Sequence, residues 1–234
     1  MFFLKRIVFI IFTISAYPVS ANVVITGTRV IYPAGQHNVN VQLTNVGISP
    51  SLIQAWIDNG DPKAAPETIK TPFVITPPIA RIDGNKGQTL RLSYTGEPLP
   101  ADRESVFYLN VLDIPPNPRD KNKNYLQIAI RSRIKIFFRP EKIKIKLSEA
   151  YENVKWSTRG NQLIVDNPTP YFITYSHLEI VNDRSRYNLP HTGMVAPFSQ
   201  MSFPLQKPIK AGTKVNWVVI DDNGARPSGT VLLQ

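Results

Sequence analysis

Apolar and polar side chains alternate along residues 125–138. Successive side chains of an extended strand point to opposite faces, so a period of two predicts a β-strand with one apolar face. The even positions carry Leu126, Ile128, Ile130, Ser132, Ile134, Ile136 and Phe138. At about 3.3 Å per residue the stretch would be about 46 Å long, whereas strands usually have about 5–6 residues. Arg139-Pro140 ends the stretch, since proline cannot continue a ladder.

Proline favours strands over helices in the rest of the chain as well. The sequence has 21 prolines in 234 residues, or 9.0%, against a usual ~5%. Proline breaks helix interiors, so short strands bounded by turns are expected. Four such segments precede the long stretch, at 39–43, 51–57, 89–94 and 106–112. The segment 106–112 is largely apolar, which is typical of a central strand that is buried on both sides.

A second set of strands is predicted after Pro140, at 142–147, 161–166, 172–181 and 214–220. Two sets of short strands with turns between them indicate two β-sandwiches. We place the domains at residues 22–142 and 143–234, both of a size that is usual for a sandwich. The fold class predicted from the pattern is therefore all-β.

The first 21 residues have the pattern of a secretory signal peptide. Lys5 and Arg6 precede an apolar run at 7–14, and Val19-Ser20-Ala21 places small side chains where a signal peptidase reads. Cleavage is expected after Ala21. The alternative is a membrane anchor, but the run is shorter than the ~20 apolar residues that span a bilayer. We expect an exported chain without membrane insertion.

The charge balance gives no indication of a nucleic-acid partner. The formal net charge is +10, from 27 basic and 17 acidic residues. Without Lys5 and Arg6 it is 25 − 17 = +8. A basic excess can serve nucleic acid or an anionic membrane, but here it is spread over strand-like segments and no nucleic-acid-binding motif occurs. A solvated basic surface explains most of it.

Catalytic and metal-binding patterns are also missing from the sequence. There is no cysteine, and the histidines are His37, His177 and His191, without metal-ligand spacing. No nucleophile elbow, phosphate-binding loop or dinucleotide fingerprint occurs. Asp102 and Glu104 form only a weak acid–base candidate. We therefore predict no enzyme, no cofactor and no metal site.

The long alternating stretch has two interpretations. Its apolar side chains could all be core. In the second interpretation, Leu126, Ile128 and Ile130 project beyond their own sheet, because a single sandwich is too short for about 46 Å of strand. An apolar edge of this kind suits strand addition to a partner. Periodicity alone leaves the two interpretations about equal.

Lys135 and Arg29 are candidates for holding an anion of that partner. A chain end carries a carboxylate, which lysine and arginine bind through charge-assisted hydrogen bonds. Buried without an anion, the same cations would be costly. The sequence does not by itself place Arg29 beside Lys135.

A set of ordered motifs resembles the periplasmic pilus chaperones of the chaperone–usher pathway, the PapD-like family. The motifs cover essentially all of the chain after residue 21. They are Thr28-Arg29-Val30-Ile31-Tyr32-Pro33, Ala55-Trp56, Thr76-Pro77-Pro78, Leu99-Pro100-Ala101-Asp102-Arg103-Glu104-Ser105, residues 110–116, residues 126–135, Phe138-Arg139-Pro140 and Asn167-Pro168-Thr169-Pro170-Tyr171.

The resemblance implies two immunoglobulin-like sandwiches in an L or boomerang shape. It implies that pilin or fimbrial subunits are the partners, delivered in the periplasm to an outer-membrane usher. By resemblance, Arg29 and Lys135 anchor the C-terminal carboxylate of a subunit, while Leu126, Ile128 and Ile130 form a donor strand that enters the subunit's groove.

The resemblance also implies an interdomain charge network of Glu104, Arg139 and Asp222. The segment 117–124 is polar and of modest length, which places the chain in the short-loop branch of the family. Self-association through the donor strand is expected for the free protein. The alternatives are a secreted structural fibre subunit or adhesin, and a hydrolase. The first lacks an evident strand-donating extension after Ala21, and the second lacks a nucleophile–base pair.

Overall fold

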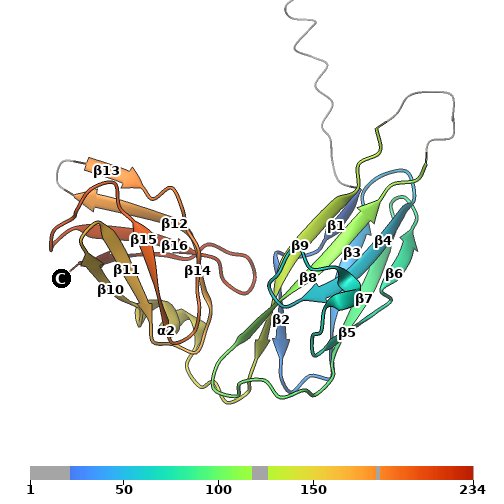
Figure 1. Ribbon diagram of the computed structural model, residues 1–234, viewed down its shortest axis with the longest axis horizontal. Coiled ribbons are helices and arrows are strands. Elements are labelled where there is room, and N and C mark those ends of the chain that lie inside the picture. Colours follow the sequence, from blue (N-terminus) through green and yellow to red (C-terminus); the bar gives the residue numbers. More distant parts are fainter. Residues whose placement is uncertain (1–21, 118–125, 183–184, 234) are drawn as a thin grey trace, which may run out of the picture.

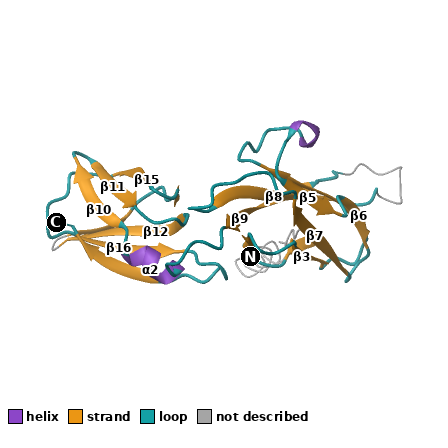
Figure 2. Cartoon of the chain, turned by 90° about the horizontal axis from the view of Figure 1, so that it is seen from below, coloured by secondary structure: helices purple, strands orange, loops and turns teal. Residues whose placement is uncertain are grey.

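Two β-sandwiches with separate hydrophobic cores meet at an angle, so that the chain has the shape of a boomerang (Figure 1). The computed structural model describes residues 22–117, 126–182 and 185–233. Within these ranges nearly all of the regular structure is strand, with only short helical pieces (Figure 2). The predicted all-β fold of two sandwiches is confirmed.

The N-terminal sandwich packs a four-stranded sheet against a five-stranded sheet. The four-stranded sheet has the order β1 (Val23–Ile25), β3 (Asn38–Asn45), β7 (Gly87–Tyr94), β5 (Phe73–Thr76). The five-stranded sheet has the order β2 (Arg29–Pro33), β9 (Ile130–Arg139), β8 (Ser105–Ile114), β4 (Ser51–Asp58), β6 (Ile79–Ile82). A 3-10 turn, η1 (Pro66–Thr68), lies between β4 and β5.

The second sandwich follows a short helix, α2 (Leu147–Glu152). One of its sheets has the order β10 (Lys155–Arg159), β11 (Gln162–Asn167), β15 (Ser199–Pro204). The other has the order β13 (Ser185–Asn188), β12 (Ile173–Asn182), β16 (Lys214–Val219), β17 (Ser228–Leu232), with β14 (Met194–Val195) paired to β12.

Seven strand segments predicted from the sequence coincide with observed strands. They are β3, β4, β7, β8, β11, β12 and β16. As predicted, β8 is a central strand, hydrogen-bonded to β9 on one side and to β4 on the other. Its core-facing side chains Phe107, Leu109 and Val111 are buried, because both neighbours and the opposite sheet cover them.

An aromatic cluster fills the end of the N-terminal sandwich that lies next to the second domain. Tyr32 and Phe138 stack with ring centroids 5.9 Å apart, and Phe73 meets Tyr32 edge-on at 5.3 Å. The hydroxyl of Tyr32 accepts the backbone N–H of Tyr94 at 3.0 Å. Aromatic pairs of this geometry add stability beyond the apolar area they bury. The cluster therefore holds the C-terminal end of β9, which carries Phe138, firmly in the core.

The long alternating stretch is only partly a strand, because β9 begins at Ile130 rather than near residue 125. The last pair of its ladder joins Ile130 to Asp113 on β8. The chain after Ile114 continues as Pro115-Pro116, and proline has no N–H with which to extend a ladder. Residues 126–129 therefore lie outside the sheet.

The predicted strand at 142–147 is wrong. Residues 141–146 form turns and irregular chain, and α2 begins at Leu147. Lysine and isoleucine alternate here as they would in a strand, but the segment crosses from one sandwich to the other and has no neighbouring strand with which to pair. A period of two is necessary for a half-buried strand, but it does not supply the partner.

The division at residue 142 stays a prediction, which two separate cores support: one is built from residues between 23 and 138, the other from residues between 151 and 233.

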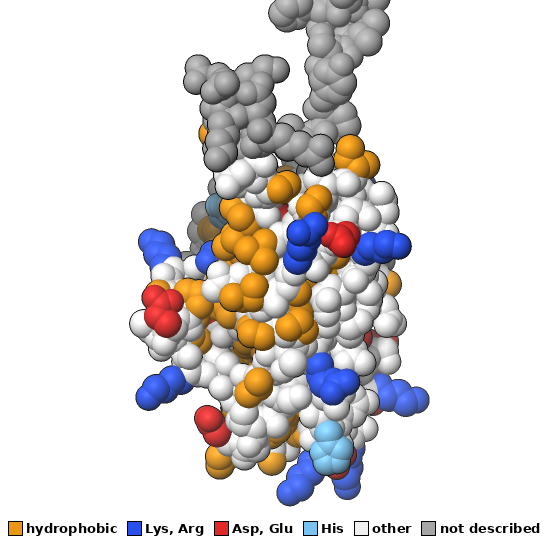
Figure 3. Space-filling view, turned by 90° about the vertical axis from the view of Figure 1, so that its right-hand side faces the viewer, with side chains coloured by type: hydrophobic (Ala, Val, Ile, Leu, Met, Phe, Trp, Pro, Cys, Tyr) orange, Lys and Arg blue, Asp and Glu red, His pale blue; other side chains and the backbone are white. Residues whose placement is uncertain are grey.

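Apolar side chains gather on the face of the N-terminal sandwich that points away from the second domain (Figure 3). Exposed hydrophobic side chains of this sandwich include Leu52, Val74 and Ile79.

Candidate functional site

Arg29 and Lys135 are neighbours across a parallel strand pair. The chain leaves the four-stranded sheet after β1, turns at Gly27 with a φ of +96°, and continues as β2 along β9. Glycine adopts this backbone conformation without strain. The register pairs Arg29 with Lys135 and, four residues later, Pro33 with Arg139. The structure thus brings together the two cations that the sequence could not place side by side.

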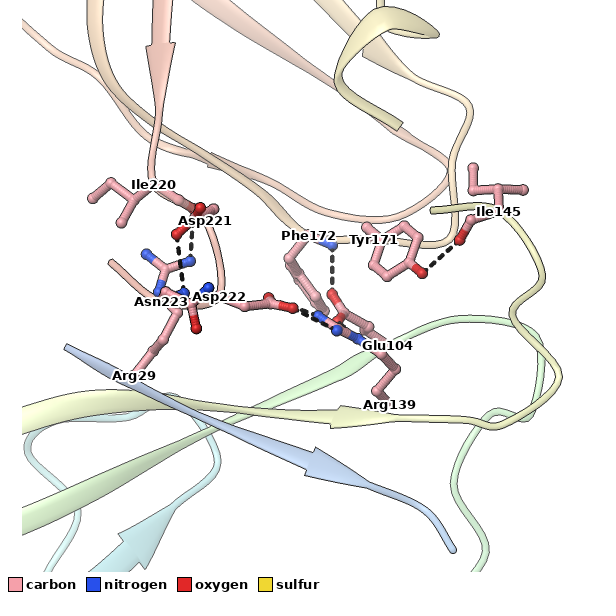
Figure 4. Close-up of polar contacts among 10 residues, drawn as sticks. All are labelled: Arg29, Glu104, Arg139, Ile145, Tyr171, Phe172, Ile220, Asp221, Asp222 and Asn223. Carbon is pink, nitrogen blue, oxygen red and sulfur yellow. Dashed lines mark hydrogen bonds and ion pairs between the residues drawn. The ribbon is translucent and has the colours of Figure 1, made fainter. Parts of the chain in front are cut away.

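Arg29 reaches the second domain. Its Nη1 donates to the backbone carbonyl of Ile220 at 2.8 Å (Figure 4), and its guanidinium lies 5.6 Å from the ring centroid of Phe137. Its Nε is buried and has no hydrogen-bond partner among the residues that the structure describes. Burial lowers the pKa of Arg29, although the charges of Asp222, Tyr151 and Asp221 partly oppose the shift.

Lys135 lies close to two other cations, Arg29 and Arg133. Burial lowers the pKa of its ammonium, and the charges of Arg29 and Arg133 lower it further. Within the part of the chain that the structure describes, no acidic side chain forms an ion pair with it. Two half-buried cations lie side by side, and one of them has an unused donor, which are the charge and the donors that an anion requires.

Arg133 belongs to the same face of β9, but its charge is already neutralised. Its Nη2 lies 2.5 Å from Asp58 Oδ1, and its guanidinium stacks 3.6 Å from the ring centroid of Tyr108. Asn110 donates to the other oxygen of Asp58 at 2.7 Å. The sequence does not indicate this pair, because Asp58 and Arg133 are 75 residues apart and meet only in the folded sheet. The pairing leaves Lys135 and Arg29 as the half-buried cations available to an anion.

The three residues of the expected charge network meet at the junction of the two domains (Figure 4). Arg139, at the end of β9, donates from Nε to Glu104 Oε1 at 2.8 Å. Its Nη1 and Nη2 bind both oxygens of Asp222, at 2.6 Å and 2.8 Å. Asp222 comes from the turn after β16, so the fork of one arginine joins the two sandwiches.

Backbone and aromatic contacts reinforce this junction. The second oxygen of Glu104 accepts the N–H of Phe172 at 2.9 Å, and the N–H of Glu104 donates to the carbonyl of Pro170 at 2.9 Å. Tyr171 donates to the carbonyl of Ile145 at 2.7 Å and lies under the guanidinium of Arg139, 5.1 Å from its ring centroid. The motif from Asn167 to Tyr171 therefore supplies a structural contact between the domains.

Burial controls the ionisation of this network. Glu104 is 3% exposed, and burial raises the pKa of its carboxyl, an effect that the charge of Arg139 and the N–H of Phe172 partly offset. Burial alone would lower the pKa of Arg139, but hydrogen bonds to Asp222 and the charges of both carboxylates raise it overall. Arg139 therefore stays charged and holds both acids.

The expected donor residues lie at the other end of β9. Leu126 is 84% exposed and Ile128 is 56% exposed, whereas Ile130 is half-buried and pairs with Asp113. Gln127, between them, donates to the carbonyl of Pro115 at 2.6 Å, which keeps the segment near the end of β8. Leu126 and Ile128 are thus apolar side chains without a core of their own, as expected if they project beyond the sheet.

Some expectations concern residues or groups outside what the structure describes. The signal peptide at 1–21 and most of the segment 117–124 lie outside the described residues. Among the described residues, no three histidine or acidic side chains are placed to hold a metal ion. None of the helices described is long and apolar enough to cross a membrane.

Two family models match the chain. Residues 22–144 match the N-terminal domain described as "Pili and flagellar-assembly chaperone, PapD N-terminal domain". Residues 149–231 match "Pili assembly chaperone PapD, C-terminal domain". Together the matches cover nearly all of both sandwiches, and residues 145–148 between them lie in neither match.

Known proteins with the same domain pair are similar over nearly their whole length. The chaperone protein HifB of Haemophilus influenzae is 49% identical over 224 residues, which cover 94% of this chain and 91% of HifB. The crystal structure of the CupB2 chaperone of Pseudomonas aeruginosa superposes with a TM-score of 0.79 at 36% identity, covering 90% of this chain and 100% of the other. The SafB chaperone of Salmonella enterica, solved in complex with the SafA pilin, superposes with a TM-score of 0.78 at 26% identity, covering 93% and 99%.

Removing Arg139 should uncouple the two domains. In Arg139→Ala the buried Glu104 keeps its desolvation cost but loses its cation. We expect the free energy of unfolding to fall by about 3–5 kcal/mol, the usual cost of breaking a buried ion pair from one side. Chemical denaturation measures the loss, and small-angle scattering should show a wider distribution of domain angles.

The matched control is Arg81→Ala, which breaks an exposed ion pair with Asp83 in the same domain. It should change stability by at most about 1 kcal/mol. Equal effects of the two substitutions, with unchanged scattering for Arg139→Ala, would contradict a coupling role for the network.

Proposed function

Because this chain belongs to the PapD-like family of pilus-assembly chaperones, we propose that it holds pilus subunits by lending them a strand and binding their C-terminal carboxylate. It acts as a binding protein for fimbrial subunits, not as an enzyme. A fibre subunit or adhesin is the less favoured alternative, since the similar curated proteins are chaperones.

The observation that carries this proposal is the exposure of Leu126 and Ile128 on an extended segment that continues β9. A soluble protein normally suppresses an unpaired apolar edge. Added to a subunit with an incomplete sandwich, the segment forms backbone hydrogen bonds while alternate side chains fill its groove. Burying Leu126, Ile128 and Ile130 would contribute roughly 1.5–3 kcal/mol each, enough to hold a subunit without covalent chemistry.

The cation pair fixes the register of the added strand. Lys135 follows Ile130 by five residues, which is roughly 17 Å along an extended strand. A subunit that binds along the edge of β9 would therefore have its chain end at Arg29 and Lys135 while its groove covers the apolar side chains. The carboxylate would accept from the unused Nε of Arg29 and from the ammonium of Lys135.

The remaining parts of the proposal concern place and other partners. The leader directs the chain to the periplasm and is cleaved after Ala21. There it delivers subunits to an outer-membrane usher. Leu52 and Ile79 are exposed on the same side of the β4–β6 pair, and they offer a surface for a second partner that a subunit on β9 leaves free. Without a subunit, the donor segment favours self-association.

Removing either cation should weaken subunit binding without unfolding the chaperone. Lys135→Met keeps an apolar side chain of similar length, and Arg29→Ala removes the other donor. We expect each to weaken binding by about 10- to 100-fold, the value of one charge-assisted hydrogen bond. The dissociation constant for a purified subunit measures the effect, with the exposed Lys155→Met as control.

A subunit with an amidated C-terminus separates the anchor from general electrostatics. It should bind the unmodified chaperone weakly and lose nothing more with Lys135→Met. If both chaperones bind intact and amidated subunits equally well, the carboxylate anchor is wrong.

A charge on the donor segment should prevent strand addition. Ile128→Asp would place a carboxylate in the apolar groove of the subunit, which costs several kcal/mol. We expect the substituted protein to fold normally, because Ile128 is already exposed, but to lose the subunit during co-purification. Ala129→Asp is the matched control, since the same charge one residue later points to the opposite side. Normal capture by Ile128→Asp would exclude Ile128 as a donor residue.

A further inference from the structure

Three acidic side chains are buried among the described residues, and one of them has no cation. Asp58, Glu104 and Asp113 are 1%, 3% and 6% exposed. The first two form ion pairs with Arg133 and Arg139. None of the ion pairs found among the described residues involves Asp113. A buried carboxylate is costly unless a cation or several donors compensate it.

Asp113 lies at the end of β8, facing the interior of the sandwich. Its Oδ2 accepts the backbone N–H of Val23 at 3.1 Å, so it connects β8 to the edge strand β1 of the opposite sheet. Its Oδ1 is buried and has no hydrogen-bond partner in the described part of the chain. One neutral donor for two carboxylate oxygens leaves this site incomplete.

The residue before Val23 is held in place by its own contacts. The carbonyl of Asn22 accepts the N–H of Val46 at 2.7 Å. Its side chain lies against Gly47, where an added Cβ would be 2.6 Å from Asn22 Oδ1. From standard bond lengths, the nitrogen of Asn22 is at most about 3.7 Å from the nitrogen of Val23. Since Val23 N is 3.1 Å from Asp113 Oδ2, the nitrogen of Asn22 is at most about 3.7 + 3.1 = 6.8 Å from that oxygen.

We propose that removal of the leader creates the missing cation, and that the α-ammonium of Asn22 binds Asp113. Hydrolysis of the Ala21–Asn22 bond consumes one water and leaves a carboxylate on Ala21 and an amine on Asn22. This amine is largely protonated at neutral pH, since its usual pKa is about 7.7–8.0. The proposal rests on the cleavage after Ala21 given above, but not on subunit binding.

Processing then has a structural consequence. The ion pair holds the three-residue edge strand β1 against the end of β8. Asp113 also pairs in register with Ile130, the first residue of β9 and the base of the donor segment. The uncleaved chain would contain the same carboxylate without its cation, so the sandwich becomes fully stable only after export.

The test compares the mature chain with one in which Gly-Ser is inserted between Ala21 and Asn22. Mass spectrometry identifies the first residue of each exported protein. The insertion moves the ammonium away from Asp113 and keeps the overall charge. We expect it to lower the melting temperature by roughly 3–8 °C. Asp113→Asn should lower it in the mature chain, but should have no effect or raise it in the extended chain, where the carboxylate lacks a cation.

Asp83→Asn, at an exposed carboxylate, is the control and should have the same small effect in both backgrounds. Three results would overturn the proposal: a mature chain that does not begin at Asn22, equal melting temperatures with and without the insertion, or an equal loss from Asp113→Asn in both chains. Subunit binding by the same proteins is measured separately, so failure here does not depend on the chaperone function.

Discussion

The pairing of β9 with its neighbours determines where a partner strand can add. Residues 135–139 pair with β2 on one side, and residues 135–138 also pair with β8 on the other. Residues 130–134 pair with β8 alone, and residues 126–129 lie outside any strand. The C-terminal half of β9 is thus paired on both sides, whereas its N-terminal half is paired on one side only. The free edge begins where Arg29 and Lys135 stand in register.

Electrostatic compensation separates the structural cations from the one pair that is left for an anion. Arg133 is neutralised by Asp58, and Arg139 by Glu104 and Asp222. These ion pairs hold the five-stranded sheet and the domain angle. Among the described residues, the charges that act on Lys135 are those of Arg29 and Arg133, and Arg29 has a buried Nε without a hydrogen-bond partner. These two cations therefore carry positive charge that no ion pair among the described residues neutralises.

The position of Arg29 in the proposed anion site depends on the domain junction. Arg139 ends the same strand that carries Lys135, and the turn after β16 supplies both Asp222 and, through Ile220, the carbonyl that holds Arg29. A change in the angle between the sandwiches would move this carbonyl and with it the guanidinium. The charge network is thus a structural requirement for the geometry of the anion site.

Much of the fold followed from local patterns, whereas the contacts between distant residues did not. A pattern of short alternating or apolar segments bounded by turns located seven strands. It was wrong at 142–147, where no neighbouring strand exists, and it overextended β9, whose end is set by the prolines after β8. The parallel register of Arg29 with Lys135 and the Asp58–Arg133 pair depend on tertiary packing, which no local signal in one sequence reveals.

The crystal structure of the chaperone with a bound subunit tests the central claim most directly. We predict that a subunit strand lies along the free edge of β9, with Leu126, Ile128 and Ile130 inside the subunit's sandwich and its C-terminal carboxylate bonded to Arg29 and Lys135. A subunit bound on another face, with residues 126–130 still exposed to solvent, would contradict it.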